Sequence, residues 1–381
     1  MSTAFVPKEI QPGETRVALV ADGVKRLAAT GLSIQIESGA GVAARVSDAD
    51  YEKAGAKIVG SEAWAAADVV LKVQPPTLAE VARLKSGAVL VSFVYAIANR
   101  AVADALVKAN VSTLAMELVP RITRAQAMDA LSSQATVAGY KAVILGAAHS
   151  PRMFPLLMTA AGTVPPARVV VFGAGVAGLQ AIATAKRLGA VVEATDVRYA
   201  AKEQVESLGG RFIEVPGLAD LQDAGGYAKE ASAEVLAKQR EAVGKKVAEA
   251  DVVVTTALVP GRPAPKLVSA DTVRTMKSGA VIVDLAVESG GNCELSELGK
   301  IVEKHGVTII GIANLPATVP VHASELYSKN VLNMVKLFVD KQGALATDFK
   351  DEVLAGSLLT HRGAICHEAT AKALSAQLAP A

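Results

Sequence analysis

Short runs of Val, Ile and Leu alternate with Ala-rich stretches along most of the chain. This pattern predicts buried parallel strands separated by helices, and hence an α/β fold. A first series of expected strands lies at 16–20, 33–37, 68–73, 88–93 and 111–115. A second series lies at 168–172, 191–196, 211–215, 251–256, 280–285 and 307–312.

Two sequence matches relate these series to each other. ADVVLKV at 67–73 resembles ADVVVTT at 250–256, and LKSGAVLVSF at 84–93 resembles MKSGAVIVDL at 276–285. Coincidence between Val-rich strands is one explanation, and two domains of one architecture is the other. A length of 381 residues exceeds one ordinary core and favours the second explanation. The predicted fold class is therefore α/β, with two doubly wound Rossmann-like domains and a cleft between them.

Two long helical segments mark where the chain changes domain. The Ala-rich run at 132–150 contains no proline and predicts a helix leading from the first domain into the second. The run at 323–341 has apolar residues at three- to five-residue steps and predicts a helix that returns the chain to the first domain. The predicted domains are thus 1–131 plus 319–381, and 132–318. The cleft between them is the expected ligand site.

The strongest chemical signal is a glycine-rich turn between an expected strand and an expected helix, within 167–190. Gly173 permits the tight turn, and Gly175 lets the backbone approach a pyrophosphate. Gly178 lets the helix pack close to the strand, while the helix N-terminus faces the phosphates. A GxGxxG motif alone is weak evidence, but here its context is that of a dinucleotide site.

An acidic residue follows this motif at the expected distance. Asp196 ends the next predicted strand, 18 residues after Gly178. A carboxylate there accepts hydrogen bonds from ribose hydroxyls and repels a 2′-phosphate, which favours NAD over NADP. Arg198 argues the other way, because a guanidinium can pair with that phosphate. Val176 and Val197 complete the predicted nucleotide site, and a purely structural glycine turn with a surface aspartate is the simpler alternative.

Composition excludes several classes of function. The net charge is +2 from 39 basic and 37 acidic residues, without a basic stripe interleaved with aromatics, so no nucleic-acid partner is expected. Cys293 and Cys366 lack metal-ligand spacing, which predicts no metal site and fits a reduced, cytoplasmic chain. The N-terminus is unlike a signal peptide, and no apolar run reaches the roughly 18 residues of a membrane span. Direct membrane insertion is therefore not expected.

No residue stands out as a catalytic acid or base. The five histidines are His149, His305, His322, His361 and His367. Each is explained more readily as a helix-end or packing residue than as a catalytic one. A dehydrogenase that reduces a carbonyl must move a proton as well as a hydride. Direct hydride exchange between two nicotinamide rings needs no such group, and the absence of a clear proton donor favours it.

These residues together resemble one family. The similar segments are 7–19, 115–134, 158–190, 194–198, 202–210 and 283–293. They resemble the NAD(H)-binding component, or domain I, of the proton-translocating NAD(P) transhydrogenases and, more distantly, alanine dehydrogenase. The resemblance implies direct hydride transfer from NADH to NADP, coupled to proton translocation, with NADP(H) held only by a partner subunit. It also implies a homodimer with NADP-binding and membrane-spanning partner subunits. The chain resembles the split form, held by those subunits at the cytoplasmic face of the bacterial inner membrane.

The same resemblance implies a nicotinamide-contacting loop in the first domain. Its residues here are Arg121, Gln126, Asp129 and Ser132. Arg121 offers rigid donors for the carboxamide oxygen, and Asp129 can hold that guanidinium in place. Gln126 can bond to the ribose or the carboxamide, and Ser132 adds a hydroxyl. Without the resemblance, a polar helix start is the more common explanation of such a run.

A second implied feature is a mobile loop at AGGYAKE, 224–230, that closes over the nucleotide. Gly225 and Gly226 supply backbone freedom for a hinge, and Tyr227 is placed to reach the nucleotide. A solvated loop that runs into a charged helix is the alternative.

Two other functions compete with a transhydrogenase component. Arg16 and Lys72 match the substrate-carboxylate groups of alanine dehydrogenases, which keeps an amino-acid dehydrogenase open. However, the catalytic histidine of that family aligns with Tyr95, and its nearby aspartate aligns with Glu288. Tyrosine, with a pKa of about 10, is a poor substitute for an imidazole. An NAD-sensing binding protein fits the glycine loop but leaves the polar residues of the nicotinamide loop unexplained.

Overall fold

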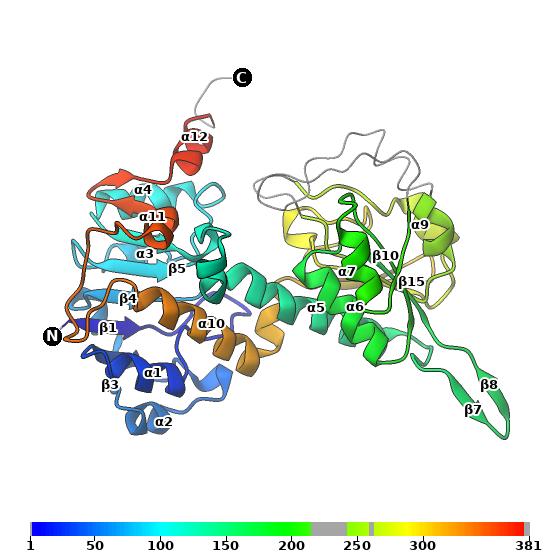
Figure 1. Ribbon diagram of the computed structural model, residues 1–381, viewed down its shortest axis with the longest axis horizontal. Helices are drawn as coiled ribbons and strands as arrows, with labels where there is room; N and C mark the ends of the chain where they lie inside the picture. Colours follow the sequence, from blue (N-terminus) through cyan, green and yellow to red (C-terminus); the bar gives the residue numbers. More distant parts are fainter. Residues whose placement is uncertain (1, 215–241, 259–262, 377–381) are drawn as a thin grey trace. The chain divides into compact units, whose positions relative to one another are not determined.

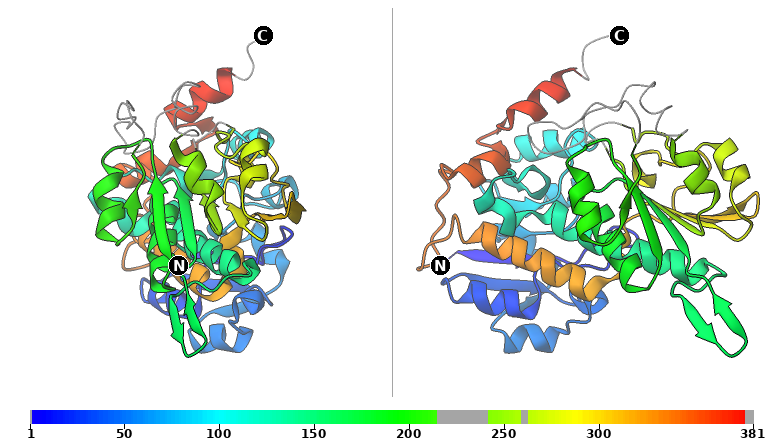
Figure 2. Two further views of the ribbon diagram at one scale, coloured as in Figure 1. Left: turned by 90° about the vertical axis from the view of Figure 1, so that its right-hand side faces the viewer. Right: turned by 45° about the vertical axis from the view of Figure 1, so that its right-hand side comes forward.

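The computed structural model describes residues 2–214, 242–258 and 263–376 (Figure 1). The chain forms two compact units, here called the first domain (1–134 with 317–381) and the second domain (135–316). Each contains a mostly parallel sheet flanked by helices, which confirms the predicted fold class. The views in Figure 2 show each domain with its own sheet.

The first domain is built on an eight-stranded sheet of order β17-β16-β6-β5-β4-β1-β2-β3. Its strands are β1 (Thr3–Val6), β2 (Ser33–Glu37), β3 (Lys57–Val59), β4 (Val69–Leu71), β5 (Val89–Ser92), β6 (Ser112–Ala115), β16 (Leu358–His361) and β17 (Ala364–Ile365). Its helices are α1 (Ala21–Ala28), α2 (Asp48–Lys53), α3 (Leu78–Val81), α4 (Arg100–Lys108), α10 (Pro320–Val335), α11 (Glu352–Ser357) and α12 (Glu368–Ala376). Strands β1 to β6 are parallel, and β16 joins β6 antiparallel.

The second domain is built on a seven-stranded sheet of order β11-β10-β9-β12-β13-β15-β14. Its strands are β9 (Arg168–Phe172), β10 (Val191–Thr195), β11 (Arg211–Phe212), β12 (Val252–Thr255), β13 (Val281–Asp284), β14 (Lys300–Lys304) and β15 (Val307–Gly311). Helices α6 (Val176–Arg187), α7 (Ala201–Ser207) and α9 (Ala270–Thr275) follow in chain order. A hairpin of β7 (Leu157–Thr159) and β8 (Gly162–Val164) projects from this domain (Figure 1). Helix α5 (Ala130–His149) leads into it.

The two sheets repeat one topology, down to individual bonds. In both, six parallel strands take the doubly wound order 3-2-1-4-5-6, and an antiparallel strand pairs with the outer edge of the sixth, β16 in the first sheet and β14 in the second. Asp68 accepts the first N–H of β1 at 2.9 Å and pairs with Lys85 at 2.6 Å. Asp251 accepts the first N–H of β9 at 2.8 Å and pairs with Lys277 at 2.9 Å. The sequence matches at 67–93 and 250–285 therefore reflect two domains of the same architecture.

One predicted strand is wrong. Residues 16–20 are not a strand but an irregular segment before α1, and the first strand is β1. The segment is apolar and buried like a central strand, with Val17, Ala18 and Leu19 at most 1% exposed. Two of its N–H groups, however, bond to side chains of α10. Val17 N–H donates to the Ser324 hydroxyl at 3.1 Å, and Val20 N–H donates to the Ser328 hydroxyl at 3.2 Å. Hydrogen bonding to a helix replaces the ladder that a strand needs.

The two long helices form where the pattern predicts them. Helix α5 begins two residues before the predicted 132–150 segment, at Ala130. Helix α10 begins at Pro320, in the first turn where proline is tolerated, and ends at Val335, short of the predicted 341. Across the described ranges, no helix is long and apolar enough to cross a membrane.

Candidate dinucleotide site

The glycine turn lies directly after β9 and leads into α6. Gly173 has a φ of 91°, a conformation that favours glycine. A Cβ on Gly178 would lie 1.8 Å from the Gly173 carbonyl oxygen, so only glycine fits there. A Cβ on Gly175, by contrast, would meet nothing within 4 Å. The fold therefore requires the first and third glycines, whereas the second leaves open space beside the loop, as a pyrophosphate would need.

Thr256, just after β12, holds the base of this turn. Its hydroxyl donates to the carbonyls of Phe172 at 3.0 Å and Gly173 at 3.2 Å. A Cβ on Gly173 would lie 2.5 Å from the Thr256 oxygen, so the two residues pack closely. Sequence reasoning missed Thr256, although the Thr-Thr pair that ends VVVTT was a signal that the strand finishes in hydroxyl groups.

Asp196 lies beside the turn and is buried, with its carboxylate engaged within the protein. Its Oδ2 accepts the Ala174 N–H at 2.7 Å. Arg198 supplies the other bonds, from its N–H at 2.8 Å and Nε at 2.9 Å to Oδ1, and from Nη2 at 2.8 Å to Oδ2. Four donors match the acceptor capacity of a carboxylate. Ribose hydroxyls must therefore displace part of this arrangement to bind Asp196.

The remaining predicted nucleotide residues lie nearby in the chain. Val176 is the first residue of α6 and is 41% exposed. Val197 is half-buried between the paired Asp196 and Arg198. Tyr227 and the predicted mobile loop at 224–230 lie outside the described residues.

The predicted nicotinamide-contacting residues belong to the first domain. Arg121 and Gln126 are exposed. The short helix that carries Gln126 (Thr123–Met128) is anchored by its buried Ala125 and Met128. Asn330 of α10 further fixes it by donating to the Ala127 carbonyl at 2.9 Å.

Asp129 and Ser132 form the start of α5. The Asp129 carboxylate accepts the Ser132 N–H at 2.9 Å and the Ser132 hydroxyl at 2.6 Å. This is the geometry of a helix N-cap, which satisfies an N–H in the first turn. These bonds give Asp129 and Ser132 a structural role, whether or not they also contact a ligand.

Arg16 and Lys72 are buried in the first domain and paired with carboxylates of the same chain. Arg16 Nη2 lies 2.6 Å from Glu14, and Lys72 Nζ lies 3.1 Å from Glu9 and 3.0 Å from Glu80. Burial opposes the charge of Lys72, but the two carboxylates outweigh it and raise its pKa. Burial likewise opposes the charge of Glu14, but Arg16 lowers the Glu14 pKa to about 2. Both cations are thus neutralised internally.

Tyr95, which the resemblance aligns with the catalytic histidine of alanine dehydrogenases, has unusual geometry. Its φ is 50°, and its ring stacks on Phe93 with centroids 5.4 Å apart. The carboxylate of Glu117 accepts the N–H groups of Val94, at 3.1 Å, and of Tyr95. Burial raises the pKa of Glu117 to about 7. Glu288, which the resemblance aligns with that family's aspartate, is exposed and accepts the Asn314 N–H at 3.2 Å.

Three of the histidines form hydrogen bonds to nearby protein groups. His149 bonds to the Leu145 carbonyl at 2.9 Å, one turn earlier in α5. His361 contacts the Ser112 hydroxyl at 2.9 Å, and His367 contacts Thr370 at 2.8 Å. In the described part of the chain, no group of three His, Cys, Asp or Glu residues could hold a metal ion.

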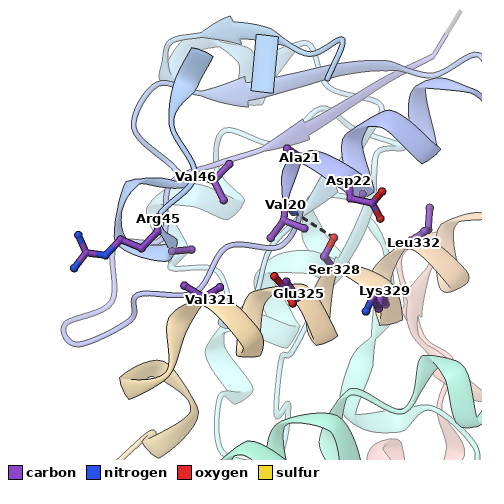
Figure 3. Close-up of a pocket in the computed structure, with 12 residues that line it drawn as sticks. Val20, Ala21, Asp22, Arg45, Val46, Val321, Glu325, Ser328, Lys329 and Leu332 are labelled. Atoms are coloured by element: carbon purple, nitrogen blue, oxygen red, sulfur yellow. Dashed lines mark hydrogen bonds between the residues drawn. The ribbon is translucent and has the colours of Figure 1, made fainter. Parts of the chain in front are cut away.

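A pocket of about 370 Å³ lies elsewhere in the first domain (Figure 3). It is lined by the start of α1, by residues 44–46 and by one face of α10. Val20 N–H bonds to the Ser328 hydroxyl within it, and the side chain of Arg45 points away (Figure 3). None of the predicted site residues lines this pocket.

Comparison with known proteins identifies relatives over the whole chain. Residues 5–138 match the family described as alanine dehydrogenase/PNT, N-terminal domain, and residues 142–368 match its C-terminal domain. The chain is 54% identical over 374 residues to the first part of NAD(P) transhydrogenase subunit alpha of Rhodospirillum rubrum. This match covers 96% of the chain and 97% of that protein. It is 34% identical over 375 residues to alanine dehydrogenase of Mycobacterium tuberculosis, covering 96% and 95%. The crystal structure of transhydrogenase from Sinorhizobium meliloti superimposes with a TM-score of 0.88 at 47% identity, covering 96% of this chain and all of that one.

Proposed function

The chain belongs to the alanine dehydrogenase/PNT family, and we propose that it is the NAD(H)-binding component of a proton-translocating NAD(P) transhydrogenase. The observation that carries this proposal is the whole-length identity of 54% with a transhydrogenase alpha subunit, against 34% with an alanine dehydrogenase. The resemblance noted in the sequence agrees with both similarities.

In this proposal the second domain binds the adenine half of NAD(H). Bound NADH supplies the hydride that NADP⁺, held only by a partner subunit, accepts to become NADPH. The N–H groups between Gly173 and Gly178, at the N-terminus of α6, hold the pyrophosphate. Asp196 accepts the ribose hydroxyls, and Arg198 moves off its carboxylate as they arrive. Val176 and Val197 contact the nucleotide beside these groups, and Tyr227 reaches it from the loop that closes.

Residues of the first domain orient the nicotinamide. Arg121 and Gln126 hold the carboxamide and so orient the nicotinamide ring for hydride transfer. Asp129 and Ser132 fix the start of α5 and, with it, the end of the loop that carries Gln126. An alignment error of about 1 Å at this point can lower a transfer rate about a hundredfold. No side chain has to exchange a proton in the transfer itself.

We also propose a homodimer, and the β7–β8 hairpin is the feature that supports it. A two-stranded hairpin is marginally stable on its own in water. Large apolar side chains on or beside it are exposed, namely Met153 at 54%, Leu156 at 53%, Met158 at 79% and Val164 at 40%. Exposed apolar side chains in this number favour a surface that a second copy covers.

The NADP-binding and membrane-spanning subunits are the other partners in this proposal. They would hold the chain at the cytoplasmic face of the bacterial inner membrane and carry the coupling to proton movement. The R. rubrum relative, by its name, is one piece of an alpha subunit.

An amino-acid dehydrogenase is the second candidate, because Arg16 and Lys72 are both present and buried. One experiment separates the two functions. The purified chain is given NADH deuterated at the transferred position, first with a separately expressed NADP-binding subunit and NADP⁺, then alone with pyruvate and ammonia. Label in NADPH, without dilution from water, supports the transhydrogenase component. NADH consumption by the chain alone with pyruvate and ammonia would instead show an amino-acid dehydrogenase and would contradict the transhydrogenase proposal.

A further inference from the structure

The repeated architecture allows one domain to serve as a control for the other. Val89 opens β5 and Val281 opens β13, and their N–H groups donate to the carbonyls of Asp68 and Asp251 at 2.8 and 3.0 Å. Bonds of this kind occur in both sheets and belong to the shared fold. A polar network built from residues that only one of the two sheets has is not required by the shared fold, and it can serve a role specific to its own domain.

Such a difference lies at the last residue of two equivalent strands. Ser92 ends β5, is fully buried, and its hydroxyl has no hydrogen-bond partner among the described residues. Asp284 ends β13, is 1% exposed, and its carboxylate accepts five bonds. The donors are Thr255 Oγ1 (3.0 Å), the N–H groups of Ala286 (3.0 Å), Asn292 (3.1 Å) and Cys293 (3.0 Å), and Ser296 Oγ (2.6 Å). The first domain forms its doubly wound sheet without this network; directly after β5, the carboxylate of Glu117 accepts the N–H groups of Val94 and Tyr95 instead.

The Asp284 network places the carboxamide of Asn292, which is fully buried. Asn292 Nδ2 donates to the carbonyls of Ala257 and Pro265, both at 2.9 Å. Asn292 Oδ1 accepts the Ala257 N–H at 3.0 Å. The carboxamide therefore pairs with the main chain of Ala257 as a neighbouring strand would, and it fixes the main chain directly after β12.

The residue before Ala257 is Thr256, which holds the glycine turn. Thr256 bonds through its hydroxyl to the carbonyls of Phe172 and Gly173, and its N–H donates to Phe172 at 2.8 Å. A continuous chain of bonds thus runs from Asp284 through Asn292 and Thr256 to the first glycine of the dinucleotide loop.

We propose that Asp284, Asn292 and Thr256 are positioning residues that hold the dinucleotide loop ready for a pyrophosphate. This inference rests on the proposed NAD(H) site. Loop N–H groups bind a pyrophosphate well only if they are already oriented, because ordering them on binding costs affinity. Thr256 fixes the carbonyl side of the loop, and Asn292 fixes Thr256 through Ala257. In this proposal all three act through the main chain of the loop rather than by direct contact with the nucleotide.

A matched pair of variants at Thr256 tests the proposal. Thr256→Val removes the hydroxyl and keeps the shape, whereas Thr256→Ser keeps the hydroxyl. Calorimetry should show NADH binding about tenfold weaker for Thr256→Val and within about twofold of the unaltered protein for Thr256→Ser. Thr275→Val is the control, since it removes an exposed hydroxyl that donates to the Thr272 carbonyl at 2.7 Å, away from the loop. This control should bind NADH normally.

Asn292→Asp provides an independent variant and a readout that a purely structural role would not move. The new carboxylate oxygen faces the carbonyls of Ala257 and Pro265, so NADH binding should weaken at least tenfold. ADP-ribose, which carries the pyrophosphate but no nicotinamide, should lose as much affinity as NADH in both damaging variants. Adenosine, followed by NMR titration, should lose less because it has no phosphate. If Asn292→Asp does not fold, the Thr256 pair still decides.

The outcomes separate this inference from the proposed function. Unaltered protein that fails to bind NADH at all would refute the dinucleotide site itself. Normal NADH binding by Thr256→Val would refute the positioning role while leaving the site intact. Equal losses for NADH, ADP-ribose and adenosine would also refute it, because they would show general damage to the domain.

Discussion

The pair formed by Asp196 and Arg198 leads to a prediction about nucleotide selectivity. The Arg198 side chain is 17% exposed and that of Asp196 is 5% exposed, with Nη2 of one 2.8 Å from Oδ2 of the other. The guanidinium thus screens the carboxylate that would otherwise repel a 2′-phosphate. We predict that Arg198→Ala increases the preference for NADH over NADPH, because Asp196 then presents an unscreened charge and free acceptor positions to the ribose.

The size of the effect follows from the distance and the burial. Two unit charges about 4 Å apart interact by roughly 4 kcal/mol at an effective dielectric constant of about 20. If unscreening Asp196 adds about a third of that energy, or about 1.4 kcal/mol, to its repulsion of the 2′-phosphate, the NADPH Kd rises about tenfold. We therefore expect the ratio of the NADPH Kd to the NADH Kd to rise about tenfold or more in Arg198→Ala, from a value that already favours NADH in the unaltered protein.

Calorimetric titration of both nucleotides at constant ionic strength measures this ratio. Arg168→Ala is a matched control, since Arg168 lies at the opposite end of β9, exposed and paired with Glu249 at 2.6 Å. It should leave the ratio unchanged. A ratio that stays the same or falls in Arg198→Ala would show that the arginine does not screen Asp196. Equal Kd values for NADH and NADPH in the unaltered protein would contradict the assignment of Asp196 to the ribose.

Three further predictions concern other regions of the chain. Gln126→Asn should leave NADH binding nearly unchanged but slow single-turnover hydride transfer about a hundredfold, and a normal rate would contradict its orienting role. Met158→Asp places a charge near the tip of the exposed hairpin and should convert the proposed dimer into monomer in sedimentation, without lowering the Tm of the monomer; an unchanged oligomeric state would contradict the proposed dimer surface. Glu117 has a pKa raised to about 7 by burial, so the folded protein holds a proton that the unfolded chain releases above about pH 4.5. The contribution of this proton to the free energy of unfolding is full below that pH and is lost as the pH rises toward 7. In urea unfolding, Glu117→Gln should lack this decline. An identical pH dependence in both proteins would refute the assignment of the decline to Glu117.

Local signals account for the features that the sequence predicts well. The strand, glycine turn and helix around Gly173 depend on residues within one segment, where a positive φ and a close helix–strand approach leave little choice but glycine. The repeated sequences also identify equivalent strands, because each carries its own Asp–Lys pair at the N-terminal end.

Features that depend on distant partners escape such reasoning. Residues 16–20 have the apolar run of a buried strand, but the hydroxyls that bond to the N–H groups of Val17 and Val20 come from positions 307 and 308 residues further along the chain. Asn292 likewise gains its role from Ala257, 35 residues earlier. An isolated asparagine after two glycines is compatible with any turn, and only the folded chain shows which main-chain groups it bonds.

The first domain bears on the choice between a transhydrogenase component and an amino-acid dehydrogenase. A keto-acid substrate needs a cation for its carboxylate and a group that transfers a proton near neutral pH. Arg16 and Lys72 already bond to Glu14, Glu9 and Glu80, so a substrate carboxylate would have to compete with buried ion pairs. Separating such pairs leaves charges buried without partners, at a cost of several kcal/mol. Tyr95, in the place of the imidazole, offers no proton donor matched to neutral pH. Binding a keto acid would thus break buried ion pairs and would find no imidazole at this position, whereas hydride transfer between nicotinamides requires neither a substrate carboxylate site nor an imidazole.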